Sequence, residues 1–290
     1  MSKNLFIISL VFVNLLLQGC NSVISQTSET EVKSEIPQPQ IDEVPKQQKV
    51  ESKGVSFSYS PQVLGEVKME ETAERPLEDG THKPDYVAPQ HILFKWKNAK
   101  QNRETVIYIS SIEDYRRMYD AVPSESDYAK QFDENLRGLQ KVIKDKNYRM
   151  KGEISFLPFY DAHQTFQGKV KNISFQNGEG IFFLTQIDWE PSLINNEGLI
   201  YCFQGISNDG KNYILAKFPV SVSFLPKDYD ADKFEDYKLP EIFYNYKSNQ
   251  KQHDDYVSNI AKRLNNLSPD EFEPNLNYFE EMVSSIKVEK

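Results

Sequence analysis

Residues 165–188, TFQGKVKNISFQNGEGIFFLTQID, decide the fold because they describe an antiparallel hairpin. Apolar and polar residues alternate along the first half, as in a strand with one buried face. The alternation changes phase once, which predicts a β-bulge. The two phases are Phe166, Gly168 and Val170, followed by Ile173 and Phe175. Asn177-Gly178 is the strongest short hairpin signal, so residues 180–188 should return alongside the first strand.

Further strands are predicted on both sides of this hairpin. Residues 198–207 and 211–221 should form a second hairpin around the turn Asn208-Asp209-Gly210. The alternating segment 55–59 predicts a half-buried strand. Other strands are expected at 63–69 (after a turn at Pro61), at 91–97 and at 105–110, with a proline-rich loop at 75–89.

Helices are predicted between the strands and near the end of the chain. Ser110-Ser-Ile-Glu113 matches a capping box and should start a helix that ends near Ala121. Residues 126–144 carry apolar side chains at helical spacing: Phe132, Leu136, Leu139 and Ile143. Further helices are expected at about 240–267 and 275–284, and Ile286-Lys287-Val288 is predicted to close the chain as an edge strand. This order favours an α+β fold, an antiparallel sheet flanked by helices.

The N-terminus carries an apolar run, residues 5–17, after a short segment with one lysine. Thirteen residues of helix rise about 20 Å, too little to span the ~30 Å core of a bilayer. A secretory signal has this arrangement. Leu17-Gln18-Gly19-Cys20 resembles the lipobox of bacterial lipoproteins. The resemblance implies that residues 1–19 are removed as a signal peptide, that Cys20 is diacylated, and that the chain is lipid-anchored to a bacterial membrane outside the cytoplasm. Two or three acyl chains suffice for stable anchoring.

The segment 20–53 is rich in Ser, Gln, Glu, Lys and Pro and contains no aromatic residue. A segment of this composition cannot bury enough apolar surface to offset the entropy that it would lose on ordering. We therefore expect a disordered tether of ~30 Å average reach. Residues 54–290 hold all the aromatic residues except two in the N-terminal apolar run. They are predicted to be a single α+β domain. The net charge of −9 argues against a nucleic-acid partner.

Of the two cysteines, lipidation would use Cys20 and leave Cys202 in an apolar run. An unpaired thiol in such a run is typically a small buried hydrophobe, and no histidine near it in sequence would activate it. Trp96 is likewise expected in the core.

Two further resemblances concern the domain. The start Gly54-Val-Ser-Phe57-Ser-Tyr59-Ser-Pro61 and the end 278–288 resemble the PsbP superfamily of photosystem-associated extrinsic proteins, which implies a PsbP-like α/β/α sandwich. A central block is similar to a family of uncharacterised bacterial envelope lipoproteins, which implies a location in the cell envelope but no activity. This block comprises Phe156-Leu-Pro-Phe-Tyr160, Phe175-Gln-Asn-Gly178, Phe183-Leu-Thr-Gln186 and Phe203-Gln-Gly205.

Three residues are candidates for ligand binding. Trp189 lies in a connection between two predicted strands, and exposed tryptophans often dominate binding surfaces. Asp161 and His163 follow an apolar segment, and a carboxylate two residues from a histidine could orient it. The histidines lack metal-ligand spacing, and the acidic run 228–236 lacks the glycine and glutamate of a calcium loop, so a cation there stays an open alternative.

Neither a catalytic motif nor a cofactor motif occurs in the sequence. We therefore expect no cofactor and favour a non-enzymatic binding or assembly module that contacts the membrane through Cys20 and takes an envelope protein or a small ligand. The alternative is an extracytoplasmic hydrolase with a site assembled from distant residues. A cleft joining His163 or His91 to a carboxylate and a hydroxyl would favour the hydrolase, and an open apolar patch around Trp189 would favour binding.

Overall fold

The computed structural model describes residues 46–76, 87–98, 103–121, 127–145, 154–157, 162–228 and 246–289. All elements below belong to one compact unit, Val44–Lys290. The strands are β1 (Gln48–Ser52), β2 (Val55–Tyr59), β3 (Val67–Thr72), β4 (His91–Asn98), β5 (Arg103–Ser111), β6 (His163–Gln164), β7 (Gly168–Phe175), β8 (Gly178–Thr185), β9 (Ile187–Asp188), β10 (Ile200–Ser207), β11 (Asn212–Pro219) and β12 (Lys287–Val288). The helices are α1 (Pro61–Leu64), α2 (Ile112–Asp120), α3 (Tyr128–Lys144), α5 (Tyr246–Asn266), the 3-10 turn η3 (Pro269–Glu271) and α6 (Leu276–Ser284).

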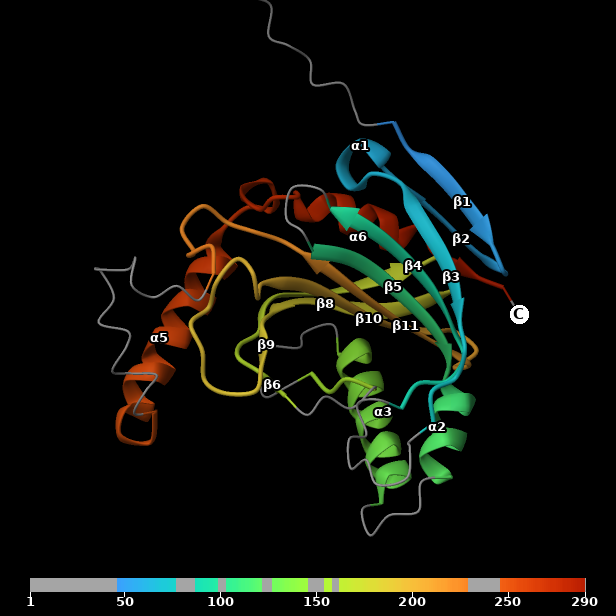
Figure 1. Ribbon diagram of the computed structural model, residues 1–290, viewed down its shortest axis with the longest axis horizontal. Helices are drawn as coiled ribbons and strands as arrows, with labels where there is room; N and C mark the ends of the chain where they lie inside the picture. Colours follow the sequence, from blue (N-terminus) through green and yellow to red (C-terminus); the bar gives the residue numbers. More distant parts are fainter. Residues whose placement is uncertain are drawn as a thin grey trace, which may run out of the picture. The chain divides into compact units, whose positions relative to one another are not determined.

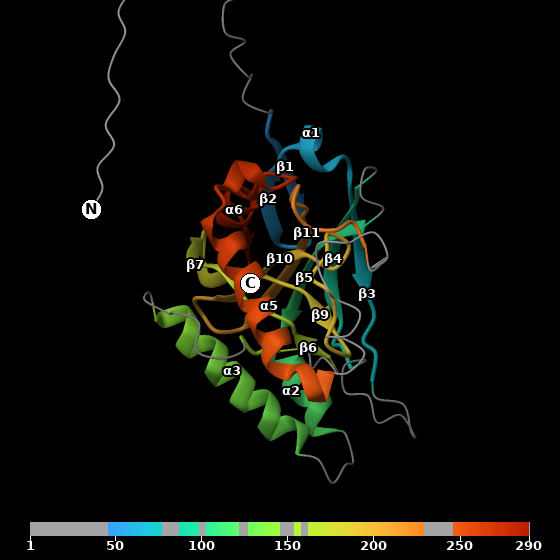
Figure 2. The same ribbon diagram turned by 90° about the vertical axis from the view of Figure 1, so that its left-hand side faces the viewer.

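Seven strands form one antiparallel sheet in the order β3-β4-β5-β11-β10-β8-β7. A smaller sheet has the order β1-β2-β12, and β6 pairs with β9 alone. Figure 1 shows α2 and α3 on one side of the large sheet and α6 with β1 and β2 on the other. Figure 2 shows α2 and α3 next to each other. The fold is therefore α+β, an antiparallel sheet flanked by helices, as the sequence predicts.

The central strands are buried on both faces, which explains why β8 and β10 are almost wholly buried instead of alternating. Toward α5 and α6 the sheet contributes Phe182, Leu184, Tyr201, Phe203, Ile214 and Phe218, among others. Toward α2 and α3 it contributes Ile181, Phe183, Cys202, Tyr213 and Leu215, among others. The ring of Phe218 stacks on Phe279 of α6 with centroids 4.4 Å apart, so α6 is bound directly to the sheet.

Both predicted hairpins are confirmed, and the predicted bulge lies between Gly168 and Lys171. The turn of the first hairpin, however, consists of Gln176 and Asn177, because Phe175 pairs with Gly178. The two-residue β12 is the predicted edge strand. The predicted helices 126–144 and 275–284 correspond to α3 and α6.

Three predicted boundaries are wrong. The end of the segment predicted as a disordered tether forms β1, which pairs with β2 along its whole length. The strand predicted at 63–69 is replaced by α1, with Pro61 in its first turn, followed by β3 from Val67. The cap of α2 is Ser111 and not Ser110, since the Ser111 hydroxyl accepts a hydrogen bond from the Asp114 N–H at 3.1 Å.

Candidate functional site

Trp189 is the most exposed large hydrophobic residue of the described part of the chain, with 62% of its surface accessible. It directly follows β9, where Asp188 pairs with His163 of β6. Of the three residues that the sequence nominated, His163 therefore lies on this short ladder and Trp189 directly after it, although 26 positions separate them. His163 is exposed as well. The third, Asp161, lies outside the described residues.

The carboxylate of Asp188 supports the loop that carries Trp189 through several hydrogen bonds. One of its oxygens, Oδ2, accepts hydrogen bonds from Thr165 Oγ1 at 2.9 Å and from Gln186 Nε2 at 2.7 Å. Ser192 Oγ donates to the same oxygen at 2.5 Å. These bonds join β9 to the segment before β7 and to the far side of the loop. They fix the chain at the residue before Trp189 and three residues after it.

Gln186 extends this network into the core. It is fully buried, and its Nε2 also donates to the Leu193 carbonyl at 2.9 Å, while its Oε1 accepts from the Asn195 N–H at 3.0 Å. A Cβ on Gly198 would lie 2.5 Å from the Gln186 side chain, so glycine is required there. Tyr256 of α5 adds a further anchor, since its hydroxyl accepts from the Ile194 N–H at 3.1 Å. Trp189 therefore lies on a pre-organised loop.

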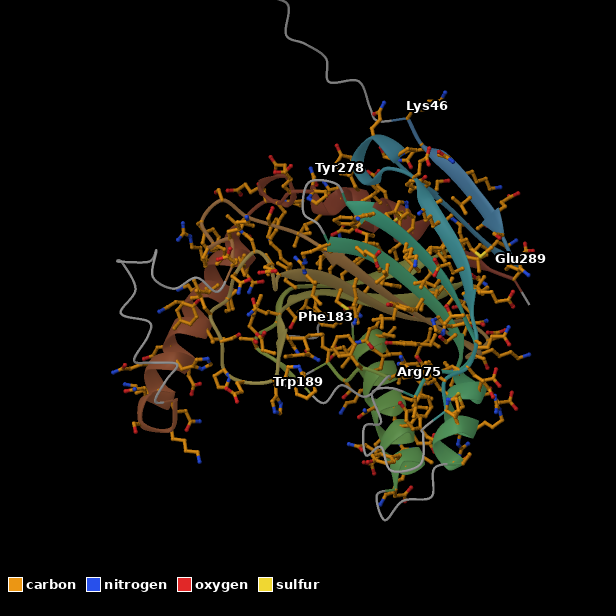
Figure 3. The ribbon with its side chains drawn as sticks, viewed as in Figure 1. Lys46, Arg75, Phe183, Trp189, Tyr278 and Glu289 are labelled. Carbon is orange, nitrogen blue, oxygen red and sulfur yellow. The ribbon has the colours of Figure 1, made fainter. Side chains whose placement is uncertain are left out.

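An open apolar patch around Trp189, which would favour binding, is not formed by the residues that the structure describes. The other exposed large hydrophobic residue among those described is Met69, 36% exposed, on β3. The exposed indole of Trp189 instead follows directly on the β6–β9 ladder that carries His163. Figure 3 shows the Trp189 side chain on the same side of the large sheet as α2 and α3.

Asp188 pairs with His163 across the β6–β9 ladder and accepts a hydrogen bond from Ser192, so this serine and this carboxylate bear on the hydrolase alternative. A serine nucleophile passes its proton to a base, usually a histidine. A hydroxyl has one proton, and that of Ser192 goes to Asp188, while Gln186 Nε2 donates to Ser192 Oγ at 3.0 Å. In this arrangement the Ser192 hydroxyl supports the loop and is not aligned for catalysis.

The sequence predictions for Cys202 and Trp96 are confirmed: both are completely buried. Burial raises the pKa of the Cys202 thiol to about 12, so the reactive thiolate is strongly disfavoured. Trp96 packs against Phe57 and Tyr59 of β2 with ring centroids 5.8 and 5.5 Å away. Neither residue is available for binding.

A concave site in another part of the fold was not predicted from the sequence. It has a volume of about 300 Å³ and lies where β3, β4, β5 and β11 meet α2. Its described lining residues are Thr72, Ala73, Arg75, Val87, Ala88, His91, Leu93, Tyr108, Tyr115, Tyr213, Leu215 and Lys217. These residues come from segments far apart in the sequence, and no local pattern connects them.

Among the residues that the structure describes, no group of three or more His, Cys, Asp or Glu side chains could hold a metal ion. The acidic run 228–236 lies outside those residues apart from Asp228. No helix within the described ranges is long and apolar enough to cross a membrane. Comparison with known proteins gave no matching family model, no matching curated protein and no matching solved structure.

Proposed function

We propose that this protein is a lipid-anchored extracytoplasmic binding or assembly module, non-enzymatic, with its contact surface at Trp189 and His163. The lipid on Cys20 holds it to a bacterial membrane after residues 1–19 are removed. The loop presents its surface to a protein of the cell envelope. Nucleic acid is not the partner, because the chain carries a net charge of −9.

The observation that supports this function is the pre-organised exposure of Trp189. A large aromatic ring that is 62% exposed has an unfavourable contact with water, which a binding partner would remove. Ordering a loop on binding costs free energy, and a loop already held by Asp188 and Gln186 avoids much of that cost. Binding surfaces are commonly built in this way from an aromatic anchor and a fixed support.

The anchor is tested by measuring the intact mass of the protein extracted from membranes, beside a Cys20→Ala variant. The expected mass is that of the chain without residues 1–19 plus a diacylglyceryl group. The variant should be soluble or unprocessed. Cleavage at another position with an unmodified Cys20 would contradict the anchor. The search for partners would then move to the secreted fraction.

The contact surface is tested by placing a photo-crosslinking amino acid at position 189 in membrane-bound protein. The matched control carries it at position 69, because Met69 is the other exposed large hydrophobic residue of the described chain and belongs to a different element, β3. A discrete adduct is expected from position 189 and not from position 69. Identical adduct patterns at both positions would show that the Trp189 surface has no specific partner.

A further inference from the structure

The small sheet ends in two edge strands that carry the same string of residues, Lys-Val-Glu. β1 contains it at 49–51, and β12 together with the residue after it contains it at 287–289. The lysine and the glutamate of each string form an exposed salt bridge with each other. β2 lies between the two strands and pairs with both. The two edges therefore offer the same side-chain chemistry, and their backbone contacts decide which of them is open.

The outer edge of β12 is occupied by a side chain of the same molecule. Asn177 donates to the Val288 carbonyl at 2.6 Å and accepts from the Val288 N–H at 3.1 Å. Both backbone groups that Val288 directs away from β2 are therefore already paired. A further strand would have to displace Asn177 before it could bind to this edge.

The contacts of β2 show which backbone groups of β1 point outward. The Ser58 N–H donates to the Ser285 hydroxyl at 2.8 Å, and the Ser58 carbonyl lies 3.3 Å from the same hydroxyl. The Gly54 carbonyl, four residues earlier, accepts from the Glu289 N–H at 2.6 Å. Both residues thus direct their backbone toward β12 and α6. Because this direction alternates along a strand, the residues that direct their backbone toward β1 are Val55, Phe57 and Tyr59.

The outer edge of β1 is consequently open. Val50 pairs with Phe57, so Val50 bonds to β2, and its neighbours Lys49 and Glu51 direct their N–H and carbonyl groups away from β2. Among the residues that the structure describes, these groups bond to no other strand. Figure 1 shows β1 at the outer margin of the sheet, beyond β2. An unpaired edge of this kind is a template for another strand.

The side chains of β1 suit a second copy of the same strand. In an antiparallel pair centred on Val50, Lys49 of each copy lies opposite Glu51 of the other. Opposite charges at directly facing positions stabilise an antiparallel pair, and like charges destabilise it. The two side chains are 65% and 66% exposed, so each can turn from its partner in the same strand to the facing strand. Val50, which packs against the core, then lies beside its own copy.

We propose that β1 is a dimer interface, at which two copies of this chain pair antiparallel about Val50 and join their three-stranded sheets into one. Lys49 of each copy then exchanges both backbone hydrogen bonds with Glu51 of the other. The contact is isologous, so it closes at two copies, and Asn177 covers the remaining edge at β12. The interface goes beyond the proposed function, because none of the residues of the Trp189 loop belongs to β1.

A strand of five residues gives a small interface, so the dimer is weak in dilute solution. Chains anchored in one membrane meet each other at a much higher effective concentration. This step alone rests on the proposed anchor at Cys20. The interface is therefore tested in the membrane, on the full chain.

The register is tested by oxidising membranes that carry the Val50→Cys chain. The two copies of position 50 face each other in a pair without hydrogen bonds, where Cα atoms about 4.5 Å apart allow a disulfide. The matched control is Gln48→Cys, because position 48 lies about 14 Å from its own copy in this register. The measured product is the peptide linked through the new thiol. We expect it from position 50 and not from position 48.

The same digest separates this result from the anchor. A peptide linked through Cys20 would show that its thiol carries no lipid, which contradicts the anchor and not the interface. The Val50→Cys chain would then be oxidised in solution at about 1 mM, the effective concentration that tethering gives. Absence of the position-50 link there would overturn the interface as well.

The charge pairing is tested with Lys49→Glu and Glu51→Lys, each in the Val50→Cys chain. Each change places like charges at both facing positions and should lower the initial rate of linkage about tenfold. Co-expression of the two variants should restore the rate, because one chain then carries two acidic residues and the other two basic residues at the facing positions. Lys287→Glu is the matched control, since it breaks the corresponding salt bridge at the closed edge and should leave the rate unchanged.

The co-expressed chains also exclude an effect within one molecule. Neither chain has the salt bridge between positions 49 and 51, so a recovered rate comes from pairing between molecules. Equal linkage at positions 48 and 50, a rate that neither charge change lowers, or no recovery on co-expression would each overturn the proposal. The crosslinking result at position 189 does not depend on any of these outcomes.

Discussion

At the scale of single residues, Cys202 and Lys217 show what burial does to ionisable groups. They pair across β10 and β11, and burial acts on both against the charged form. It raises the pKa of the Cys202 thiol to about 12 and lowers the pKa of Lys217. The sheet therefore holds one neutral thiol and one lysine whose charge is less favoured than in water.

The thiol of Cys202 should be chemically inert while the protein is folded. In a chain that begins at residue 46 it is the one cysteine, and with a pKa of about 12 it holds about a thousandfold less thiolate than an ordinary thiol. We expect no reaction with a disulfide reagent at pH 8 until urea unfolds the protein. In a Ser258→Cys control the new thiol, at an exposed position of α5, should react at once. Equal rates at both positions would refute the burial of Cys202.

Lys217→Met should stabilise the protein most at neutral pH. The folded pKa of Lys217 is below the usual 10.5, so the unfolded chain binds its proton more strongly and the charged lysine destabilises the fold at low pH. This penalty disappears as the pH rises through the folded pKa toward 10.5. Cys202 and Tyr108, whose charges act on Lys217, and His91 and Arg75, which line the same pocket, are kept in both proteins. Urea unfolding at pH 7, 9 and 10.5 measures the gain, and a gain independent of pH would contradict it.

At the scale of elements, the first hairpin was predicted correctly for a partly different reason. The Asn177-Gly178 pair signals a turn, yet Gly178 is already the first residue of β8. It must be glycine because a Cβ there would lie 2.0 Å from the Phe175 ring. Asn177 binds β12 with its side chain, donating to the Val288 carbonyl at 2.6 Å and accepting from the Val288 N–H at 3.1 Å. Asn177, which gives the local turn signal, thus also makes a long-range contact that the sequence does not reveal.

Gly180→Ala should destabilise this hairpin strongly. Gly180 pairs with Gly205 of β10, and the ring of Phe203 covers both, so that a Cβ on Gly180 would lie 2.4 Å from the ring and 2.5 Å from the Gln204 carbonyl. We expect a loss of about 3 kcal/mol in the free energy of unfolding. Gly138→Ala in α3 is the control, where the nearest atom is 3.8 Å away and a gain of about 0.5–1 kcal/mol is expected. Similar losses in both variants would contradict the close approach.

Asp188→Ala should loosen the loop that carries Trp189. The change leaves the Thr165, Gln186 and Ser192 donors without their shared acceptor, which should cost about 1–3 kcal/mol. In a Trp96→Phe background, Trp189 is the one tryptophan, and its fluorescence anisotropy should fall in Asp188→Ala. Asp188→Asn keeps an acceptor oxygen, so its losses of stability and of Trp189 anisotropy should be smaller. An unchanged anisotropy in Asp188→Ala would show that the network does not hold the loop.

At the scale of the whole molecule, the large antiparallel sheet and its helices could be predicted because their hydrophobic patterns extend over many residues. The ladder that pairs His163 with Asp188, the residue before Trp189, could not be predicted, because β6 and β9 have two residues each and show no period. The pocket could not be predicted either, since its lining extends from Thr72 to Lys217 and depends on β5 lying beside β11. Exposed single residues were recognisable, but their neighbours were not.

The small sheet was missed for a related reason. β1 has a polar, mostly exposed sequence, QKVES, in which only Val50 packs against the core, so its composition is that of a tether. What makes it a strand is its partner: β2 buries Val55, Phe57 and Tyr59 and offers its edge, and the turn between them uses Lys53 and Gly54 with φ of 52° and 74°. β12 occupies the other edge of β2. Strand formation here depends on tertiary pairing more than on local propensity.

A chain that begins at residue 54 should therefore be less stable than one that begins at residue 46. Removing β1 breaks the ladder from Gln48 to Ser52 and leaves the β2 edge unpaired. We expect a loss of about 1–2 kcal/mol, because the lost hydrogen bonds are partly offset by the entropy of the released segment. The open edge should also cause association that grows with protein concentration. Urea unfolding and size-exclusion chromatography measure both effects, and equal stability of the two chains would show that β1 belongs to the tether after all.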